Sequence, residues 1–141
     1  MRESIGTYLL VAAGAAAGAV ARVAVGLPFP GAAVAVTVVV NLAGCLAMGW
    51  LTPLSARHPG LGRFWPAVGP GFLGGFTTFS AFAVLAAVQA GDGGPAAAAA
   101  VAATVLGCPA VNYLGARLGE AAIARGAPRR PAESMRGRVG R

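Results

Sequence analysis

The sequence predicts an all-α membrane protein with four transmembrane helices, the third of them broken near its middle. Two observations predict the spans: 57% of the 141 residues are hydrophobic and only 11% are charged, whereas soluble domains carry about 25% charged residues. The third observation is the segment Gly-Gly-Phe-Thr-Thr-Phe-Ser at residues 74–80, which places glycine, threonine and serine inside a stretch otherwise apolar enough to cross a bilayer. A chain of this length accommodates about four spans of roughly 20 residues each.

The first predicted span covers residues 7–26 and is ended by Pro28, and the second covers residues 32–51 and is ended by Pro53. Both are long enough to cross the hydrocarbon core as helices. The first run also has the character of a secretory signal peptide. Because Arg22 lies before the run ends and further apolar runs follow it, we interpret it as a span.

The third predicted span covers residues 66–89 and contains the glycine break, and the fourth covers residues 95–118. Between them, residues 91–94 are Gly-Asp-Gly-Gly, which predicts a tight turn. Pro109 predicts a kink in the fourth span, because proline removes a helical hydrogen bond.

Arginine is concentrated at one end of the chain. Seven of the eleven arginines lie in residues 117–141, so we predict a transmembrane domain at residues 1–119 and a disordered cytoplasmic tail at residues 120–141. With four spans, the N-terminus, the 53–65 loop and the tail share one side, which holds ten arginines against Arg22 alone on the other. The positive-inside rule places that side, and both termini, in the cytoplasm. Such a tail is more typical of a lipid-facing signal than of a nucleic-acid groove, so we expect no nucleic-acid partner.

Two further residue types are assigned to packing. Cys45 and Cys108 both lie inside predicted spans, so neither a disulfide framework nor a zinc site is indicated. Gly14 and Gly18 are four residues apart in the first span, a spacing that lets membrane helices approach closely. We interpret both sets as structural.

Polar side chains inside the spans are few, and each is expensive to place in hydrocarbon. No Asp, Glu, Lys or His lies within any predicted span, whereas proton-coupled transporters generally use such a titrating group. Thr37 and Asn41 are one helical turn apart, so they can line one polar path or bond to a neighbouring helix. The polar residues predicted at membrane depth are Arg22, Thr37, Asn41, Thr77, Thr78, Ser80, Thr104 and Asn112.

The glycine break in the third span is the strongest indication of function. A membrane helix is interrupted only where its freed amides and carbonyls face protein, water or an ion. Breakage at Gly74 and Gly75 would free carbonyl groups that suit a hard cation, and Thr77 or Thr78 would cap the half-helix that follows. The start of that half-helix, the positive end of its dipole, would favour an anion nearby.

Phe79 and Phe82 are three residues apart, hence on one helical face, with Ser80 between them. Phenyl rings have electropositive edges that can stabilise a small anion without a formal charge. Spacing alone does not separate this role from core packing, which is the more common use of such an aromatic stripe.

Taken together, these residues resemble the CrcB/Fluc family of small bacterial fluoride channels over about residues 6–119. The most specific element is residues 71–82, Gly-Phe-Leu-Gly-Gly-Phe-Thr-Thr-Phe-Ser-Ala-Phe, which is close to the family pattern G-x-x-G-G-x-T-T-F-S-T-F. Residues 18–22 of the first span, and residues 37–44 with Gly49 of the second, agree with the family in order and spacing.

The resemblance implies an antiparallel, dual-topology dimer with two fluoride pores along the subunit interface and one sodium ion at its centre. Main-chain carbonyls of Gly74 and Thr77 from each subunit would hold the sodium. The implied pore and vestibule residues are Arg22, Asn41, Phe79, Ser80 and Phe82, to which the shared polar face adds Thr37 as a candidate.

The resemblance also implies passive export across a bacterial inner membrane. Fluoride that enters the cell as the neutral acid dissociates and is driven out by the membrane potential, which lowers the cytoplasmic fluoride concentration. Such a protein would not be an enzyme, and one His with the available carboxylates forms no recognisable nucleophile–base pair or metal cluster.

The sequence departs from the family in its polar residues and in its charge. Ala81 replaces the usual threonine between the phenylalanines, and the fourth span offers only Thr104, Cys108 and Asn112 where the family carries a row of hydroxyl residues. Whether that row replaces the usual one stays open. The arginine bias disagrees with insertion in both orientations, so we hypothesise that the chain inserts one way and pairs with an oppositely oriented paralogue.

Two alternative functions fit the sequence less well than the channel. A small multidrug-resistance-type exporter also has four spans and is dimeric, but it needs a carboxylate in its first helix, and residues 7–26 contain none. A non-transporting scaffold held by small-residue packing would leave the Gly-Gly-x-Thr-Thr break unexplained.

Overall fold

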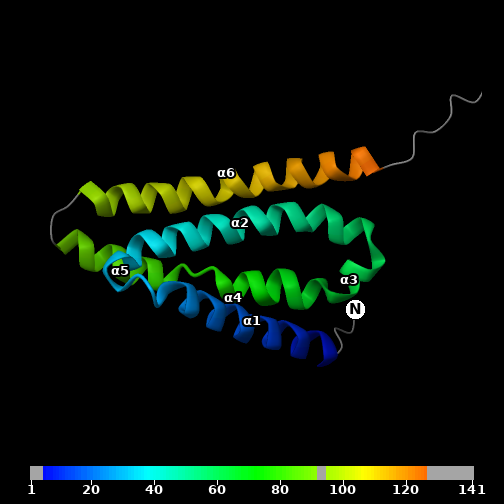
Figure 1. The fold of residues 1–141 in the computed structure, drawn as a ribbon, viewed down its shortest axis with the longest axis horizontal. Helices are drawn as coiled ribbons and strands as arrows, with labels where there is room; N and C mark the ends of the chain where they lie inside the picture. Colours follow the sequence, from blue (N-terminus) through cyan, green and yellow to red (C-terminus); the bar gives the residue numbers. More distant parts are fainter. Residues whose placement is uncertain (1–4, 92–94, 127–141) are drawn as a thin grey trace, which may run out of the picture.

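The computed structural model describes residues 5–91 and 95–126, and the regular structure in these two ranges is helical (Figure 1). The chain passes along the bundle as α1 (Ile5–Gly26), the 3-10 helix η1 (Pro30–Ala32) and α2 (Ala33–Arg57). The third pass consists of α3 (Pro59–Pro66), the π-helix η2 (Ala67–Leu73), α4 (Gly74–Phe76) and α5 (Ser80–Gly91), and the fourth is α6 (Pro95–Gly126).

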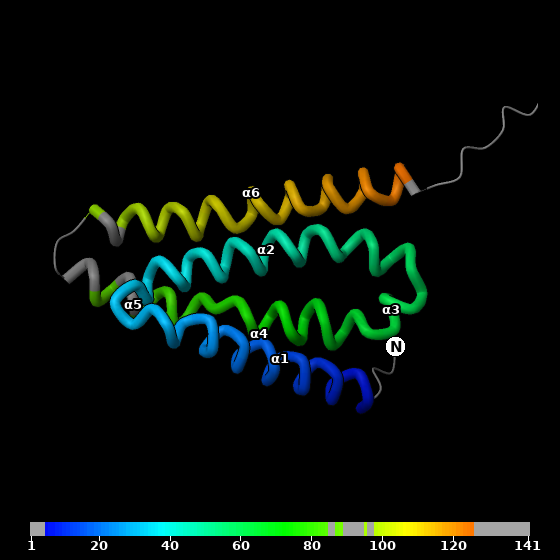
Figure 2. The backbone as a smooth tube through the Cα atoms, in the orientation of Figure 1, coloured from blue at the N-terminus to red at the C-terminus, as the bar shows by residue number. Residues whose placement is uncertain are grey.

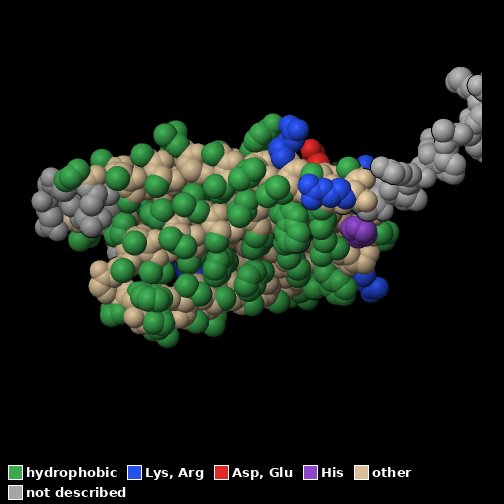
Figure 3. Space-filling view, turned by 45° about the horizontal axis from the view of Figure 1, so that its top comes forward, with side chains coloured by type: hydrophobic (Ala, Val, Ile, Leu, Met, Phe, Trp, Pro, Cys, Tyr) green, Lys and Arg blue, Asp and Glu red, His purple; other side chains and the backbone are tan. Residues whose placement is uncertain are grey.

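Four helical segments among the described residues are long and apolar enough to cross a membrane, as the sequence predicts. Their most apolar windows are only 6% to 22% buried inside the chain. Hydrophobic side chains therefore lie on the outside of the bundle, and in Figure 3 they are spread along its length, while most of the charged side chains gather toward one end. A surface of this kind is stable against lipid and not against water, which is the property of a multi-pass membrane protein.

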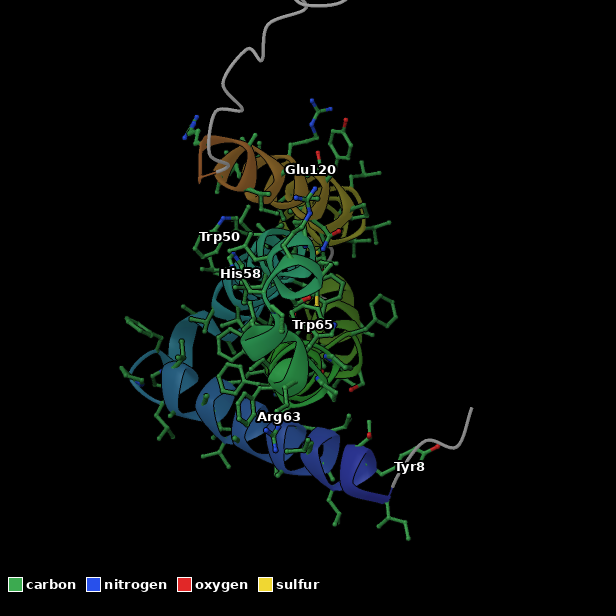
Figure 4. All side chains as sticks on the ribbon, turned by 90° about the vertical axis from the view of Figure 1, so that its right-hand side faces the viewer. Tyr8, Trp50, His58, Arg63, Trp65 and Glu120 are labelled. Carbon is green, nitrogen blue, oxygen red and sulfur yellow. The ribbon has the colours of Figure 1, made fainter. Side chains whose placement is uncertain are left out.

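The four passes run alternately up and down the bundle. α6 packs along α2, and the third pass lies between α2 and α1 (Figures 1 and 2). Because the direction reverses at each connection, the start of α1, the connection from α2 to α3 and the end of α6 lie at one end of the bundle. Figure 4 views the molecule from that end, where His58, Arg63 and Glu120 are found.

Glycines allow backbone to touch backbone between α1 and the third pass. A Cβ on Gly18 would collide with the Phe72 carbonyl oxygen, and one on Gly75 would collide with the Ala15 carbonyl oxygen. Gly14 meets the third pass in the same way. The prediction that Gly14 and Gly18 bring helices close together is confirmed.

The second helix continues past Pro53 to Arg57, so the prediction that Pro53 ends this span is wrong. Hydroxyl groups on either side of the proline bond to the backbone of the same helix. Thr52 Oγ1 donates to the Met48 carbonyl at 2.6 Å, and Ser55 Oγ donates to the Thr52 carbonyl at 2.8 Å. Bonds of this kind let membrane helices tolerate proline.

The fourth helix is also longer than its apolar run. α6 starts at Pro95, continues through Pro109 and ends at Gly126, so the predicted tail begins inside the helix. The rest of the tail, residues 127–141, lies outside the described residues, as does most of the predicted turn at residues 91–94.

The glycine contacts predict that Gly18→Ala destabilises the protein. The new methyl group would overlap the Phe72 carbonyl oxygen and the Phe76 nitrogen, and overpacking of this kind costs about 1–3 kcal/mol. Gly26→Ala on the same helix is the matched control, because a Cβ there meets nothing within 4 Å. Thermal unfolding in detergent should show a lower midpoint for Gly18→Ala alone. Equal midpoints would show that α1 can move away from the third pass without cost.

Candidate functional site

The third pass is interrupted between α4, which ends at Phe76, and α5, which begins at Ser80. Thr77 leaves the helical conformation with φ −79° and ψ 152°. The sequence predicts the break at Gly74 and Gly75, but both glycines are helical. Gly75 is needed for the contact with α1 and not for the interruption, which follows it.

Asn41 of α2 holds the interrupted segment by two hydrogen bonds to one residue. Its Nδ2 donates to the Thr78 carbonyl at 2.9 Å, and the Thr78 amide donates to Asn41 Oδ1 at 2.8 Å. Asn41 is only 4% exposed, and unpaired backbone groups at such depth would cost several kcal/mol. One side chain therefore replaces both helical bonds of Thr78.

This bridge redirects the backbone bonding of α4. In an unbroken helix the Thr78 amide would bond to the Gly74 carbonyl, but here it bonds to Asn41. The Gly74 carbonyl is thus released from its helical partner. A Cβ at Gly74 would meet nothing within 4 Å, so this side of the break is open within the chain.

The two threonines of the break have different roles. Thr77 Oγ1 donates back to the Leu73 carbonyl at 3.0 Å. Thr78 Oγ1 accepts a bond from the Ala81 amide at 3.3 Å and lies 3.4 Å from Ser80 Oγ. The prediction that one of the threonines caps the following half-helix is confirmed for Thr78.

A cavity of about 500 Å³ opens beside the break. Its walls come from α2, from the interrupted segment and from α6, and its polar lining includes Asn41, Thr77, Thr78 and Thr104. Thr104 is only 6% exposed, and among the described residues its Oγ1 has no hydrogen-bond partner. A buried hydroxyl without a partner costs about 1–3 kcal/mol, so Thr104 is an unsatisfied polar group in the wall of the cavity.

The three polar residues predicted as a row on the fourth span fall into two groups. Thr104 and Cys108 line the cavity. Asn112 does not, and its Nδ2 instead donates to the Cys45 carbonyl at 3.0 Å, which fixes α6 against α2.

The two phenylalanines touch but lie in different surroundings. Their ring centroids are 6.1 Å apart with a 50° angle between the planes. Phe82 is 2% exposed, whereas Phe79 is 69% exposed and lines the cavity. Phe79 precedes the first helical residue of α5, Ser80, so the rule that residues three apart share one face does not apply to it in full.

The remaining candidates lie away from the cavity lining. Thr37 Oγ1 donates to the Ala33 carbonyl one turn back at 2.7 Å. Ser80 is exposed at the start of α5. Arg22 is half-buried on α1, and among the described residues its Nε has no partner. The structure thus brings Asn41, Phe79 and the sodium candidates Gly74 and Thr77 together, and leaves Thr37, Ser80, Phe82 and Arg22 outside the lining.

The two cysteines, which the sequence predicts to be packing residues, belong to the site as well. Cys45 and Cys108 both line the cavity. A signal was available, because each follows a polar cavity residue by one helical turn: Cys45 follows Asn41, and Cys108 follows Thr104.

Comparison with known proteins gives similar chains with one shared name. This chain is 42% identical over 83 residues to the Fluoride-specific ion channel FluC of Ruegeria pomeroyi, and the aligned region covers 57% of this chain and 64% of that protein. It is 49% identical over 79 residues to the protein of that name from Paracoccus denitrificans, which covers 53% and 62%. It is 43% identical over 88 residues to that of Chlorobium phaeobacteroides, which covers 57% and 66%. The chain thus spans less than two thirds of the length of these curated relatives.

A family comparison covers most of the chain. Residues 9–116 match the family described as CrcB-like protein, Camphor Resistance (CrcB). The matched range includes α2, the interrupted third pass and the part of α6 that lines the cavity. The chain belongs to the CrcB-like protein family.

Proposed function

We propose that this chain is a subunit of a fluoride-specific ion channel, and that the channel lets fluoride leave the cell passively. The observation that carries the proposal is the cavity beside the interrupted pass, where the buried Thr104 hydroxyl lacks a partner among the described residues. The three relatives named Fluoride-specific ion channel FluC support the choice of ion. A channel of this kind carries out no covalent chemistry and is not an enzyme.

The cavity offers neutral hydrogen-bond donors, which suit a small anion that must also leave again. Fluoride is strongly hydrated, so a path must replace its water by groups that attract it without trapping it. Thr104 supplies a hydroxyl. The Asn41 amide nitrogen carries two N–H groups, and its bond to Thr78 uses one of them, so the second can donate to an ion in the cavity.

Phe79 adds an aromatic edge at the open side of the cavity. Its ring is largely exposed in the single chain and lines the cavity, so it is available for contact with a second surface. We propose that a second subunit covers this side and that the pore lies between the two chains. The electropositive rim of the ring then faces the anion, while Phe82 supports Phe79 from the core.

We further propose a structural sodium ion held by the carbonyls of Gly74 and Thr77 from each subunit. The residues fit such an ion in two respects. The Gly74 carbonyl has lost its helical amide to Asn41, and the extended conformation of Thr77 turns its carbonyl out of the helical direction. Sodium is a hard cation that takes oxygen ligands, and when bound it would join the two interrupted segments at the dimer centre.

The charge distribution supports a fixed orientation for this chain. The exposed cations Arg57, Arg63, Arg117 and Arg125 all belong to the end of the bundle where α2 meets α3 and α6 finishes. Arg22 lies toward the opposite end of α1. We propose that the end with the four exposed arginines, together with both termini, faces the cytoplasm of a bacterial cell. We also propose that the partner in the antiparallel dimer is an oppositely oriented paralogue.

The small multidrug-resistance-type exporter is the weaker function for this geometry. Among the described residues of α1 no side chain is acidic, and the polar groups that line the cavity are hydroxyl, amide and thiol groups with no carboxylate. A cavity of this kind does not neutralise a cationic drug, and it offers no proton-binding group for exchange.

The central test measures fluoride efflux from liposomes. The chain is purified alone and together with an oppositely oriented paralogue, and each sample is reconstituted and loaded with fluoride or chloride. We expect fluoride efflux from the paired sample and no chloride efflux from either. If neither sample releases fluoride faster than empty liposomes, the channel function is wrong.

Asn41→Asp should lower fluoride efflux about 100-fold, because a carboxylate in the cavity repels an anion and loses the donor to Thr78. Asn112→Asp is the matched control. It also removes an amide donor between two helices, but the residue does not line the cavity. Efflux is compared at equal amounts of folded protein, judged by gel filtration. An equal loss in both variants would assign Asn41 to structure alone.

Thr104→Val should lower fluoride efflux about tenfold without lowering stability. Valine keeps the shape of threonine and removes a hydroxyl that has no partner among the described residues. The substitution therefore removes only a hydrogen bond to the passing ion. One such bond is worth about 1.4 kcal/mol or more in this setting. Thr37→Val is the control, because that hydroxyl bonds within its own helix. Unchanged efflux in Thr104→Val would remove this hydroxyl from the path.

The proposed orientation is tested by the accessibility of a tag at each terminus in intact cells and in inverted membrane vesicles. We expect both tags to be exposed only in inverted vesicles, because the arginines hold this end in the cytoplasm. A population with both orientations, or a functional dimer formed by the chain alone, would contradict pairing with a paralogue.

A further inference from the structure

Two free thiols meet on the wall of the cavity. Cys45 lies on α2 one turn beyond Asn41, and Cys108 lies on α6 one turn beyond Thr104. The two side chains are close enough to interact with each other, and both line the cavity. The channel function proposed above uses neither of them.

The helices that carry the thiols are held firmly together at this level. The Cys45 carbonyl accepts the bond from Asn112 Nδ2 at 3.0 Å. Beyond it, a Cβ on Gly49 would collide with the Asn112 carbonyl oxygen, and one on Gly115 would collide with the Leu46 carbonyl oxygen. The close contact between α2 and α6 therefore holds the two cysteines in a fixed relative position. A ligand that binds both loses little free energy in ordering them.

The buried Thr104 hydroxyl is a third polar group at this place. It lines the same cavity and has no partner among the described residues. Two sulfur atoms and one oxygen are too few for zinc, which takes four ligands. Among the described residues, no three or more His, Cys, Asp or Glu side chains lie together so that they could hold a metal ion. The donor set suits a soft cation that is satisfied by two sulfur ligands.

We propose that Cys45 and Cys108 form a two-thiol binding site for a soft, thiophilic cation, with Hg²⁺ as the member whose charge matches the site. Each thiol releases its proton to water as its sulfur binds the metal, so two S–H bonds and one aqueous Hg²⁺ become one S–Hg–S unit and two protons. The product is neutral. This matters in an apolar span, because burying a net charge there is expensive.

Occupation of this site would place a metal ion beside Asn41 and Thr104 and would block the cavity. That consequence rests on the proposed channel function, whereas the binding itself does not. Mercury binding that is found without fluoride conduction would leave the two-thiol site standing and the channel proposal wrong.

The test uses the full chain in detergent, titrated with mercuric chloride. Bound metal is counted by native mass spectrometry, and remaining thiols are counted with a thiol reagent. We expect one mercury per chain and the loss of both thiols together. Cys45→Ser and Cys108→Ser should each weaken binding about 100-fold, because the second sulfur of a chelate acts at high effective concentration.

A matched control keeps the number of thiols and changes only their geometry. In the double variant Cys45→Ser and Leu106→Cys, the new thiol lies two residues from Cys108 and so on another face of α6, where Leu106 is 71% exposed. It should bind mercury as weakly as Cys45→Ser. Two mercury ions per chain, one ion that joins two chains, or full affinity in either single serine variant would each overturn the proposal.

Discussion

The hydrogen-bonded pair formed by Asn41 and Thr78 is the interaction on which the functional region depends. An interruption at membrane depth leaves backbone groups that lipid cannot satisfy. Asn41 supplies both a donor and an acceptor to Thr78 at 2.9 and 2.8 Å. Because the bridge takes the amide that would have bonded to the Gly74 carbonyl, this carbonyl is released, and the chain leaves the helical conformation at Thr77. The break, the open carbonyl and one wall of the cavity thus follow from one side chain.

The bundle around the break is rigid for a different reason. Glycines let α1 touch the third pass and let α6 touch α2 through backbone atoms, so the helices have little freedom to slide. Among the side chains that the structure describes, only a few are strongly buried. In a lipid-facing bundle the hydrophobic effect does not hold helices together, and close packing with interhelical hydrogen bonds takes its place. Asn112 contributes such a bond between α6 and α2.

The spans could be predicted from hydropathy alone, but their details could not. Pro53 indicates a helix end from its chemistry, yet neighbouring hydroxyl groups compensate for it. Gly74 and Gly75 indicate a break, yet Gly75 is small because α1 lies against it, and the break follows where Asn41 reaches across. The same limit applies to Cys45 and Cys108. Which residues face each other across helices depends on their relative rotation, and one sequence does not state it.

Polar atoms in the spans divide into those that the fold satisfies and those that it does not. Thr37, Asn41 and Asn112 bond to the backbone and so maintain the structure. Thr104 Oγ1 and Arg22 Nε are buried without a partner among the described residues. Folding gains nothing from such atoms, since each costs free energy that an apolar residue would not. A water molecule, an ion or a second chain that binds them would recover this free energy, and for Thr104 the cavity beside it leaves room for a small anion.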